Sequence, residues 1–242
     1  MDRSNLSRQR TAAINERTFF ADAAHELRTP LHSANGFVEL VLDGMAGSLN
    51  ERQQEMLGYA HLAIGQLATL LEEVLFLARA DTGEFVPHRS RVNPATSLAQ
   101  AVKSIREQLR EKNVTLTQTG TGLPATIHAD GERLREGLAA LLRGGLALAP
   151  TGGTIAVSAS VEETMLRWNV TLQDVRLDAS DTRHLFDRFY QPRPLGAERA
   201  APPGLALAIA RLTAEWHGGT VRSDSADDGS LILDYELPLG EP

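Results

Sequence analysis

The sequence predicts a chain of two domains, an all-α helical hairpin followed by an α+β two-layer sandwich. Three observations predict this fold class. The length of 242 residues suits one or two domains of about 150 residues each. Apolar residues near the N-terminus recur at a helical spacing, and strand patterns join helical ones after residue 88. We therefore assign residues 1–88 to the hairpin and residues 89–242 to the sandwich.

A seam of apolar residues predicts the first helix, and its members are Phe20, Ala24, Leu27, Leu31, Ala34, Val38 and Val41. Alternating steps of four and three residues are typical of a helix packed in a bundle. Pro30 lies inside this seam. We expect the helix to bend there, because proline lacks an N–H and crowds the preceding turn.

A second helix is predicted to follow the turn signal at residues 43–47 and to run to about Ala80. Ser48 with Glu51 three residues later predicts a capping box at its start. Its apolar stripe consists of Leu57, Ile64, Leu67, Leu71, Val74 and Ala78. Two helices with one apolar stripe each cannot close a core alone, so we expect a homodimer in which two hairpins form a four-helix bundle.

The second half of the chain mixes helical and strand-like patterns. Helices are predicted over residues 98–111, 130–148 and 205–217, and strands over residues 114–117, 154–159, 166–172, 220–223 and 231–237. Strands 154–159 and 166–172 are expected to form a hairpin around Glu162 and Glu163. Together these elements predict a sheet with helices on one side.

Composition excludes several classes of protein. With 24 Lys and Arg against 31 Asp and Glu the net charge is −7, which argues against a general nucleic-acid binder. The lack of cysteine excludes disulfides, Cys-ligated zinc and iron–sulfur clusters, and we expect no other metal site. We see neither an apolar run near the ~18 residues of a membrane span nor a signal-peptide core. We expect a cytoplasmic location, with the chain alone or as the soluble portion of a longer or membrane-attached sensor.

Residues 25–31 read His-Glu-Leu-Arg-Thr-Pro-Leu and contain the candidate catalytic residues. Thr29 and His32 lie four and seven residues after His25, on the same helix face. An exposed imidazole, with a pKa of about 6.5 when free, is a competent nucleophile near neutral pH. Glu26 can accept the proton of one ring nitrogen, and Thr29 could hold a water in line with a phosphoryl group. The spacing leaves open that His25 is one of seven ordinary histidines and Glu26 a plain helix charge.

Residues 19–31, Phe-Phe-Ala-Asp-Ala-Ala-His-Glu-Leu-Arg-Thr-Pro-Leu, resemble the H-box of two-component sensor histidine kinases. The resemblance implies that His25 is the phosphoacceptor, Glu26 the assisting acid and Thr29 the residue that supports phosphatase activity. It also implies that His25 passes its phosphoryl group to an aspartate on the receiver domain of a response regulator. We expect that domain to dock on the face of His25, Thr29 and His32.

The second half resembles the ATP-binding domain of the same family, which is of the GHKL type. Residues 185–190 are similar to its F-box and residues 204–210 to its last glycine box and the following helix. His217-Gly218-Gly219 and Leu237-Pro238 also fit. The resemblance implies that Asp174 would take the adenine amino group, and that Gly204 and Leu205 would lie at the phosphates.

Several ligand positions of that family are substituted in this chain. Its two metal-binding asparagines correspond to Ala140 and Gly144, and neither a methyl group nor a hydrogen can coordinate Mg²⁺. The glycines of its D-x-G-x-G box correspond to Arg176 and Asp178, and Asp178 near a triphosphate would repel it. Residues 201–203, Ala-Pro-Pro, replace further glycines. We therefore assign no cofactor, and Mg·ATP is expected only if this divergent site still binds it.

Three functional hypotheses follow. The first is a histidine-kinase-like signalling protein with an intact His25 and a degenerate ATP site. It would act as a pseudokinase, phosphotransferase or phosphatase, with the phosphoryl group coming from a response regulator or from another histidine kinase. The second is an active ATP-dependent sensor histidine kinase with a divergent nucleotide site. The third is a non-catalytic dimeric scaffold that binds a regulator or a kinase.

Overall fold

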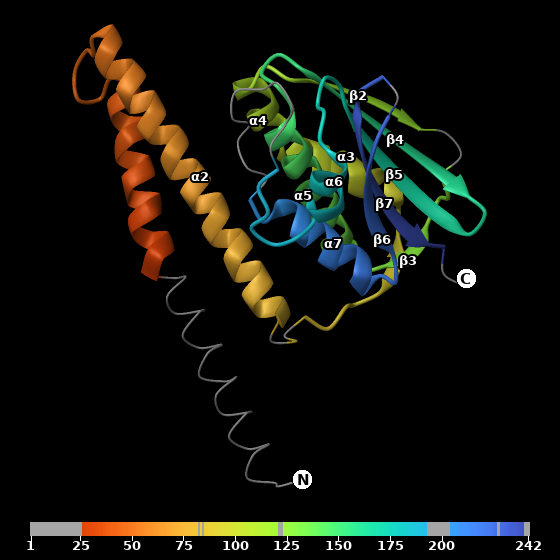
Figure 1. Cartoon of the computed structure of the whole chain (residues 1–242). Helices are drawn as coiled ribbons and strands as arrows, with labels where there is room; N and C mark the ends of the chain where they lie inside the picture. The colour runs from red at the N-terminus through yellow and green to blue at the C-terminus, as the bar shows by residue number, and fades with distance from the viewer. Residues whose placement is uncertain are drawn as a thin grey trace, which may run out of the picture. The chain divides into compact units, whose positions relative to one another are not determined.

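The structure, a computed structural model, describes residues 26–81, 83, 85–120, 123–192, 204–226 and 228–239. The chain divides into two compact units, residues 1–86 and residues 87–242. The first is helical, and the second combines a sheet with helices (Figure 1). The predicted fold class, a helical hairpin followed by an α+β domain, is confirmed.

The first unit is an antiparallel helical hairpin (Figure 1). A helix over residues 26–42, which continues through Pro30, leads by a turn into α2 (Glu51–Asp81). Nε and Nη2 of Arg28 lie 2.8 and 2.7 Å from Oε1 of Glu72, and this ion pair links the two helices. Because both side chains are about half exposed, the pair contributes no more than about 1 kcal/mol. The hairpin therefore depends mainly on apolar contacts.

The capping box of α2 lies two residues later than predicted. The Asn50 side chain accepts a hydrogen bond from the N–H of Gln53 (2.9 Å), and the Gln53 side chain accepts one from the N–H of Asn50 (3.0 Å). The prediction of Ser48 and Glu51 was wrong because α2 begins at Glu51, so Glu51 is the first helical residue and not the third. Asparagine caps as well as serine, and glutamine can replace glutamate in the box.

Much of the apolar surface of the hairpin is uncovered in the single chain. Leu27 and Leu67, one from each predicted stripe, are 52% and 53% exposed. Other exposed apolar side chains described in this unit are Phe37, Leu40, Met45, Met56, Tyr59, Leu62, Leu70 and Val86. The expectation that two such helices cannot close a core alone is consistent with this exposure.

By length and composition alone, α2 could cross a membrane. The sequence did not predict such a span, because polar and charged residues, among them Glu72 and Glu73, interrupt the apolar runs of this helix. Length and composition do not distinguish such a helix from one that packs in a bundle.

The second unit is built on a mixed five-stranded sheet in the order β2-β4-β5-β7-β6. Its strands are β2 (Thr115–Gly120), β4 (Thr154–Glu162), β5 (Met165–Leu172), β6 (Thr220–Ser225) and β7 (Leu231–Pro238). Strand β2 is parallel to β4, and the other pairs are antiparallel. The predicted β4–β5 hairpin is confirmed, with Glu162 opposite Met165. Strand β6 lies at one edge of the sheet.

Three helices cover one face of this sheet: α3 (Pro94–Ser104), α5 (Gly131–Leu148) and α7 (Ala206–Trp216) (Figure 1). The inward residues of the strands are buried against them. Trp168 and Tyr235, opposite each other on β5 and β7, are fully buried, with their rings 5.8 Å apart in an edge-on arrangement. The core of the unit therefore lies between the sheet and the helices.

Several short elements differ from the prediction. The helix predicted over residues 98–111 is two helices, α3 and α4 (Arg106–Glu111), because the backbone at Ile105 leaves the helical region. Strands β1 (Ser90–Val92) and β3 (Ile127–Ala129), which pair with each other, and helix α6 (Ala179–His184) were not predicted. Elements of three to six residues are too short for a hydrophobic period to show.

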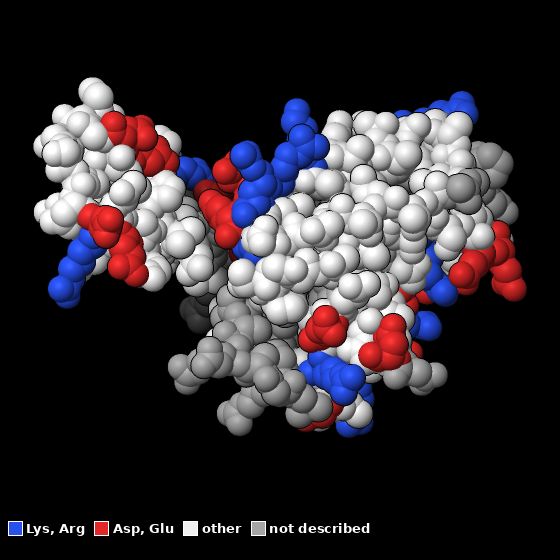
Figure 2. Space-filling view, turned by 90° about the horizontal axis from the view of Figure 1, so that it is seen from above, with Lys and Arg blue, Asp and Glu red and all other residues white. Residues whose placement is uncertain are grey.

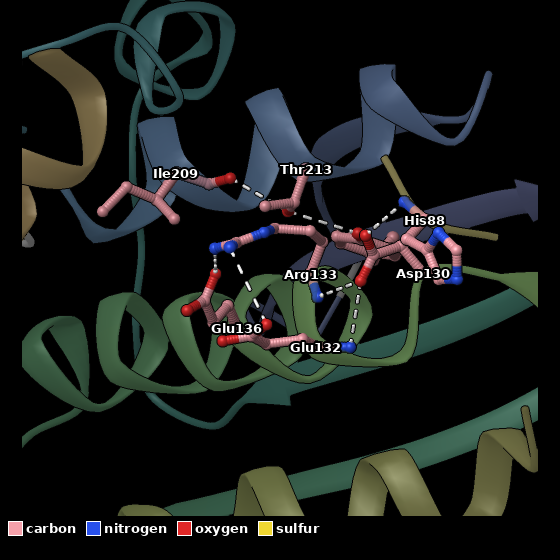
Figure 3. A network of polar contacts seen from close by, with 8 residues as sticks. His88, Asp130, Glu132, Arg133, Glu136, Ile209 and Thr213 are labelled. Carbon is pink, nitrogen blue, oxygen red and sulfur yellow. Dashed lines mark hydrogen bonds and ion pairs between the residues drawn. The ribbon is translucent and has the colours of Figure 1, made fainter. Parts of the chain in front are cut away.

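A polar network fixes the start of α5 (Figure 3). Asp130 caps this helix by accepting hydrogen bonds from the N–H groups of Glu132 and Arg133, and it also accepts one from the N–H of His88 (2.8 Å). Partial burial alone would raise the pKa of Asp130, but the N–H groups of Arg133 and His88 and the Arg133 charge hold it below its usual value. The backbone N–H of Asp130 in turn donates to Nε2 of His217, at the end of α7. The network thus links the first residues of this unit to α5 and α7.

Candidate functional site

The predicted nucleophile His25 lies outside the described residues. The residues that follow it, Glu26 and Thr29, are both exposed on the helix of residues 26–42. His32, one turn after Thr29, is exposed as well. The described part of the predicted docking face is therefore open to solvent in the single chain.

A groove of about 150 Å³ separates the two helices of the hairpin. Apolar side chains, among them Leu31, Ile64 and Leu71, form most of its walls, and His32 and Asn35 also line it. The Asn35 amide donates to Glu39 (2.7 Å), while its buried Oδ1 has no hydrogen-bond partner among the described residues. The groove therefore combines an apolar lining with an unsatisfied acceptor.

The two positions that correspond to metal ligands in the resemblance lie where α5 meets α7. Ala140 is fully buried. A Cβ atom placed on Gly144 would overlap Cγ and Cδ2 of Leu207, well inside van der Waals contact. Leu207 is itself only 1% exposed. Leu207 thus fills the space that a side chain at position 144 would need, and neither ligand position carries an oxygen.

The same face of α5 also approaches α7 at Gly137. A Cβ atom there would overlap Oγ1 of Thr213 and would lie 2.7 Å from the hydroxyl of Tyr235. Gly137, Ala140 and Gly144 follow one another by three and four residues, which places them on one helix face. Small residues on that face let α7 pack closely against α5. This face is therefore a helix contact.

The residues predicted after β5, Asp174, Arg176 and Asp178, are exposed in the segment that leads to α6, and they alternate with buried Val175 and Leu177. Asp174 has a φ of 59°, in the left-handed region. The Arg176 guanidinium lies against Gly229, in the turn between β6 and β7, and a Cβ placed on Gly229 would overlap Nε of Arg176, so that side chain would have to move. Asp178 caps α6 by accepting from the N–H groups of Ser180 and Asp181, 2.8 Å each. The Ser180 hydroxyl and these N–H groups lower the pKa of Asp178.

Gly204 and Leu205 precede α7 directly. Gly204 has a φ of 61°, a conformation that favours glycine. Leu205 is 1% exposed and makes no side-chain cap to the helix. Residues 201–203 lie outside the described part of the chain. Among the described residues, α7 thus begins with buried apolar side chains, Leu205, Ala206 and Leu207.

Among the described residues, charged side chains form no metal centre, and they form no large basic surface on the face drawn in Figure 2. Within the described residues, no group of three or more His, Cys, Asp or Glu side chains could hold a metal ion. Lys and Arg form separate small groups on the face drawn in Figure 2, and Asp and Glu lie beside several of them.

Sequence reasoning missed Leu207 and Gly229, the two residues that contact Gly144 and Arg176. Only the contact of Leu207 with Gly144 could have been inferred from the sequence. Gly137 and Gly144 stand seven residues apart in a leucine-rich helix, which indicates a closely packed face. Nothing in the sequence indicates the contact between Arg176 and Gly229.

Comparisons with known proteins agree with this architecture. Residues 15–83 match the His Kinase A (phospho-acceptor) domain. The chain is 30% identical to the sensor protein DivL of Caulobacter vibrioides, over 95% of this chain and 29% of DivL. It spans less than half the length of the curated relatives that it matches.

Two solved structures share the fold. Full-length ShkA in complex with AMPPNP has a TM-score of 0.69 at 22% identity, over 93% of this chain and 46% of that chain. The histidine kinase ThkA in complex with the response regulator protein TrrA has a TM-score of 0.61 at 18% identity, over 96% of this chain and 64% of that chain.

Proposed function

The chain belongs to the two-component histidine kinase family, and on that premise we propose that its His25 exchanges a phosphoryl group with a response regulator. We propose further that its second domain does not use Mg·ATP in the usual mode. The observation that carries the second part is the contact of Leu207 with Gly144, which leaves no space for a metal-binding side chain. A shared fold does not supply an activity whose ligands are absent.

In this proposal the hairpin of residues 1–88 carries the chemistry. A nitrogen of His25 attacks the phosphorus of an aspartyl phosphate, the P–O bond breaks and the carboxylate leaves; the reverse step returns the phosphoryl group to the regulator. Glu26 accepts the proton of the other ring nitrogen, and Thr29 orients a water for hydrolysis. The exposure of Glu26 and Thr29 supports these roles, because a docked receiver domain must reach them. We place the exchange in the cytoplasm.

The partner protein is proposed to be a response regulator that docks on the face of His25, Thr29 and His32. The structure of ThkA with its response regulator TrrA supports this class of partner. Another histidine kinase would be a second source of the phosphoryl group, through the same regulator.

We extend the proposal to a homodimer that forms through the hairpin. Exposed Leu27 and Leu67 support it, because exposed apolar patches usually mark an interface. Cβ atoms added at Gly58 and Gly65 of α2 would meet open space, so a second pair of helices has room to approach. The resulting bundle would close the core that one hairpin leaves open.

The second domain, residues 89–242, is proposed to be a degenerate relative of the ATP-binding domain. Its residues do not fit Mg·ATP, since Mg²⁺ requires oxygen ligands and Ala140 and Gly144 offer none. Asp174, Gly204 and Leu205 are the remnants of the site. Arg176 and Asp178 stand at former glycine positions, where Arg176 contacts the turn between β6 and β7 and Asp178 caps α6, and these local roles support the loss of nucleotide binding.

Nucleotide binding provides the first test. Isothermal titration of the full chain with ATP, with and without Mg²⁺, is expected to show no saturable binding at millimolar nucleotide. A histidine kinase with an intact asparagine pair serves as the positive control. Micromolar binding would overturn the degenerate site and favour an active kinase.

Phosphotransfer provides the second test. Receiver domains from the same genome, phosphorylated with labelled acetyl phosphate, are incubated with wild type, His25→Ala, Thr29→Ala and the matched control Ser33→Ala. Label is expected on wild type and on Ser33→Ala but not on His25→Ala, and the Thr29→Ala protein should hydrolyse phosphate more slowly. Equal loss of phosphate with all four proteins would contradict the proposal and favour a scaffold.

A further inference from the structure

A cleft of about 450 Å³ lies along the edge strand of the sheet in the second unit. Four consecutive residues of β6, 220–223, form one wall. Thr182 and Arg183 of α6, and Arg211 and Glu215 of α7, line the cleft from the helical side. Apart from Phe186, which belongs to the stretch that resembles the F-box, none of the residues discussed for phosphotransfer or nucleotide binding lines it. A cleft that follows a strand for four residues has the shape of an extended peptide.

The outer edge of β6 is available for pairing. Strand β6 pairs with β7 on one side, and among the described residues its backbone makes no hydrogen bond to the backbone of any other element. In an antiparallel strand every second residue directs its N–H and C=O away from the partner strand. This edge therefore offers a row of donors and acceptors to an added strand.

Two arginines at the cleft form no direct ion pair with the acidic residues that the structure describes. Arg183 and Arg222 have no carboxylate within ion-pair distance among the residues that the structure describes, and Nε of Arg183 donates to the carbonyl of Ala179 on its own helix. Arg211, in contrast, pairs with Asp187 and Glu215 (3.3 and 2.9 Å). The Arg183 charge acts on Asp178, and Asp234 lies opposite Arg222 on β7, but neither carboxylate forms a direct ion pair with its arginine among the described residues. On a chain of net charge −7, the two guanidinium groups therefore remain available to carboxylates of a partner.

The cleft also has an apolar part. Phe186, which is 7% exposed, and Val221 of β6 both line it. A bound strand would place alternate side chains on its two faces. Such a strand could therefore set an apolar side chain near Phe186 and acidic ones near the arginines.

We propose that this cleft binds an extended acidic peptide segment of a partner protein, added to β6 as a further strand, with its carboxylates paired to Arg183 and Arg222. Main-chain hydrogen bonds to β6 supply affinity, and the two guanidinium groups select acidic side chains. The site is independent of His25 and of nucleotide, so its test does not depend on the proposed phosphotransfer.

The test uses the full chain and a fluorescein-labelled peptide of alternating Glu and Val. Two matched peptides replace Glu by Lys or carry N-methyl groups on alternate backbone nitrogens. In fluorescence anisotropy the acidic peptide is expected to bind saturably, and the two matched peptides at least about tenfold more weakly. Hydrogen exchange should slow at the amides of residues 220–225 when the acidic peptide is bound.

Variants link the binding to the cleft. Arg183→Gln combined with Arg222→Gln is expected to weaken acidic-peptide binding by about tenfold or more. Arg106→Gln, which removes an exposed arginine from α4, is expected to leave it unchanged. Circular dichroism checks that both proteins remain folded. The proposal is overturned by no saturable binding of the acidic peptide, by equal binding of either matched peptide, or by a double variant that binds like wild type.

Discussion

At the scale of single residues, Gly144 shows how packing replaces a ligand. Glycine inside a helix lowers stability by about 1 kcal/mol relative to alanine, but Leu207 fills the space that the Cβ of an alanine at position 144 would need. We expect Gly144→Ala to lower the free energy of unfolding of the second unit by about 1–3 kcal/mol, because overpacking outweighs the gain in helix propensity. Urea denaturation followed by circular dichroism measures this change.

Gly145 is the matched control for this prediction. A Cβ there would lie 3.3 Å from Cδ2 of Leu172 and farther from Val170 and Leu233, so Gly145→Ala should change stability by less than about 1 kcal/mol. Adding Leu207→Ala to Gly144→Ala removes the clashing side chain, and the two effects should not be additive. Additive effects would show that this contact is not the cause.

Asp130 gives the protein a predictable pH dependence. Its folded pKa lies below the unfolded value of about 3.9, so its contribution is fully present above that value and is lost as the pH falls through the folded pKa. We expect wild type to be more stable than Asp130→Asn by about 1 kcal/mol near neutral pH, with the difference shrinking below pH ~4. Chemical denaturation over this pH range tests it, and a constant difference would contradict it.

At the scale of elements, the start of α2 distinguishes two capping boxes that fit the sequence equally well. Asn50→Ala should destabilise the hairpin by about 1 kcal/mol, because it removes the acceptor for the N–H of Gln53. Ser48→Ala should change stability by less than about 0.5 kcal/mol. Thermal unfolding of the two variants measures both effects, and a larger loss for Ser48→Ala would restore the original assignment.

Elements with a long hydrophobic period or a clear cap could be predicted from the sequence. Asp130 correctly marked the start of α5, and alternation correctly marked the β4–β5 hairpin. The three-residue strands β1 and β3 could not be predicted, because each forms only by pairing with the other. The parallel pairing of β2 with β4 could not be predicted either, since it depends on contacts between segments that are distant in the sequence.

For the candidate site, too, the residue types could be predicted from the sequence but the contacts between distant residues could not. Residue types alone showed that positions 140 and 144 carry no metal ligand. What occupies the space was not visible, because Leu207 lies far along the chain and reads as an ordinary apolar residue of α7. The same holds for the cleft beside β6, since no motif brings Arg183 and Arg222 together.

At the scale of the whole molecule, the two units differ in how their cores are completed. The second unit buries its apolar residues between its own sheet and helices, whereas the hairpin leaves Leu27 and Leu67 half exposed. If a second copy of the chain covers the hairpin, folding of the hairpin is coupled to dimer formation. The stability of the hairpin must then depend on protein concentration. The second unit should show no such dependence.

We therefore expect the full chain to unfold in two transitions, of which only the hairpin transition shifts with dilution. Each tenfold dilution should reduce the apparent stability of the dimer by about 1.4 kcal/mol. A fragment of residues 87–242, which keeps β1 and the His88 bond to Asp130, should unfold in one transition at every concentration. Scanning calorimetry and analytical ultracentrifugation at several concentrations measure both proteins.

Substitutions in α2 separate association from a general loss of stability. Leu67→Glu places a charge in the apolar stripe and should give a monomer, whereas Gln66→Glu adds the same charge at a neighbouring exposed position and should leave the dimer intact. If the hairpin transition of wild type does not shift with dilution, or if both variants remain dimers, the hairpin is not closed by a second copy. Its exposed stripes would then have to be covered by a different protein.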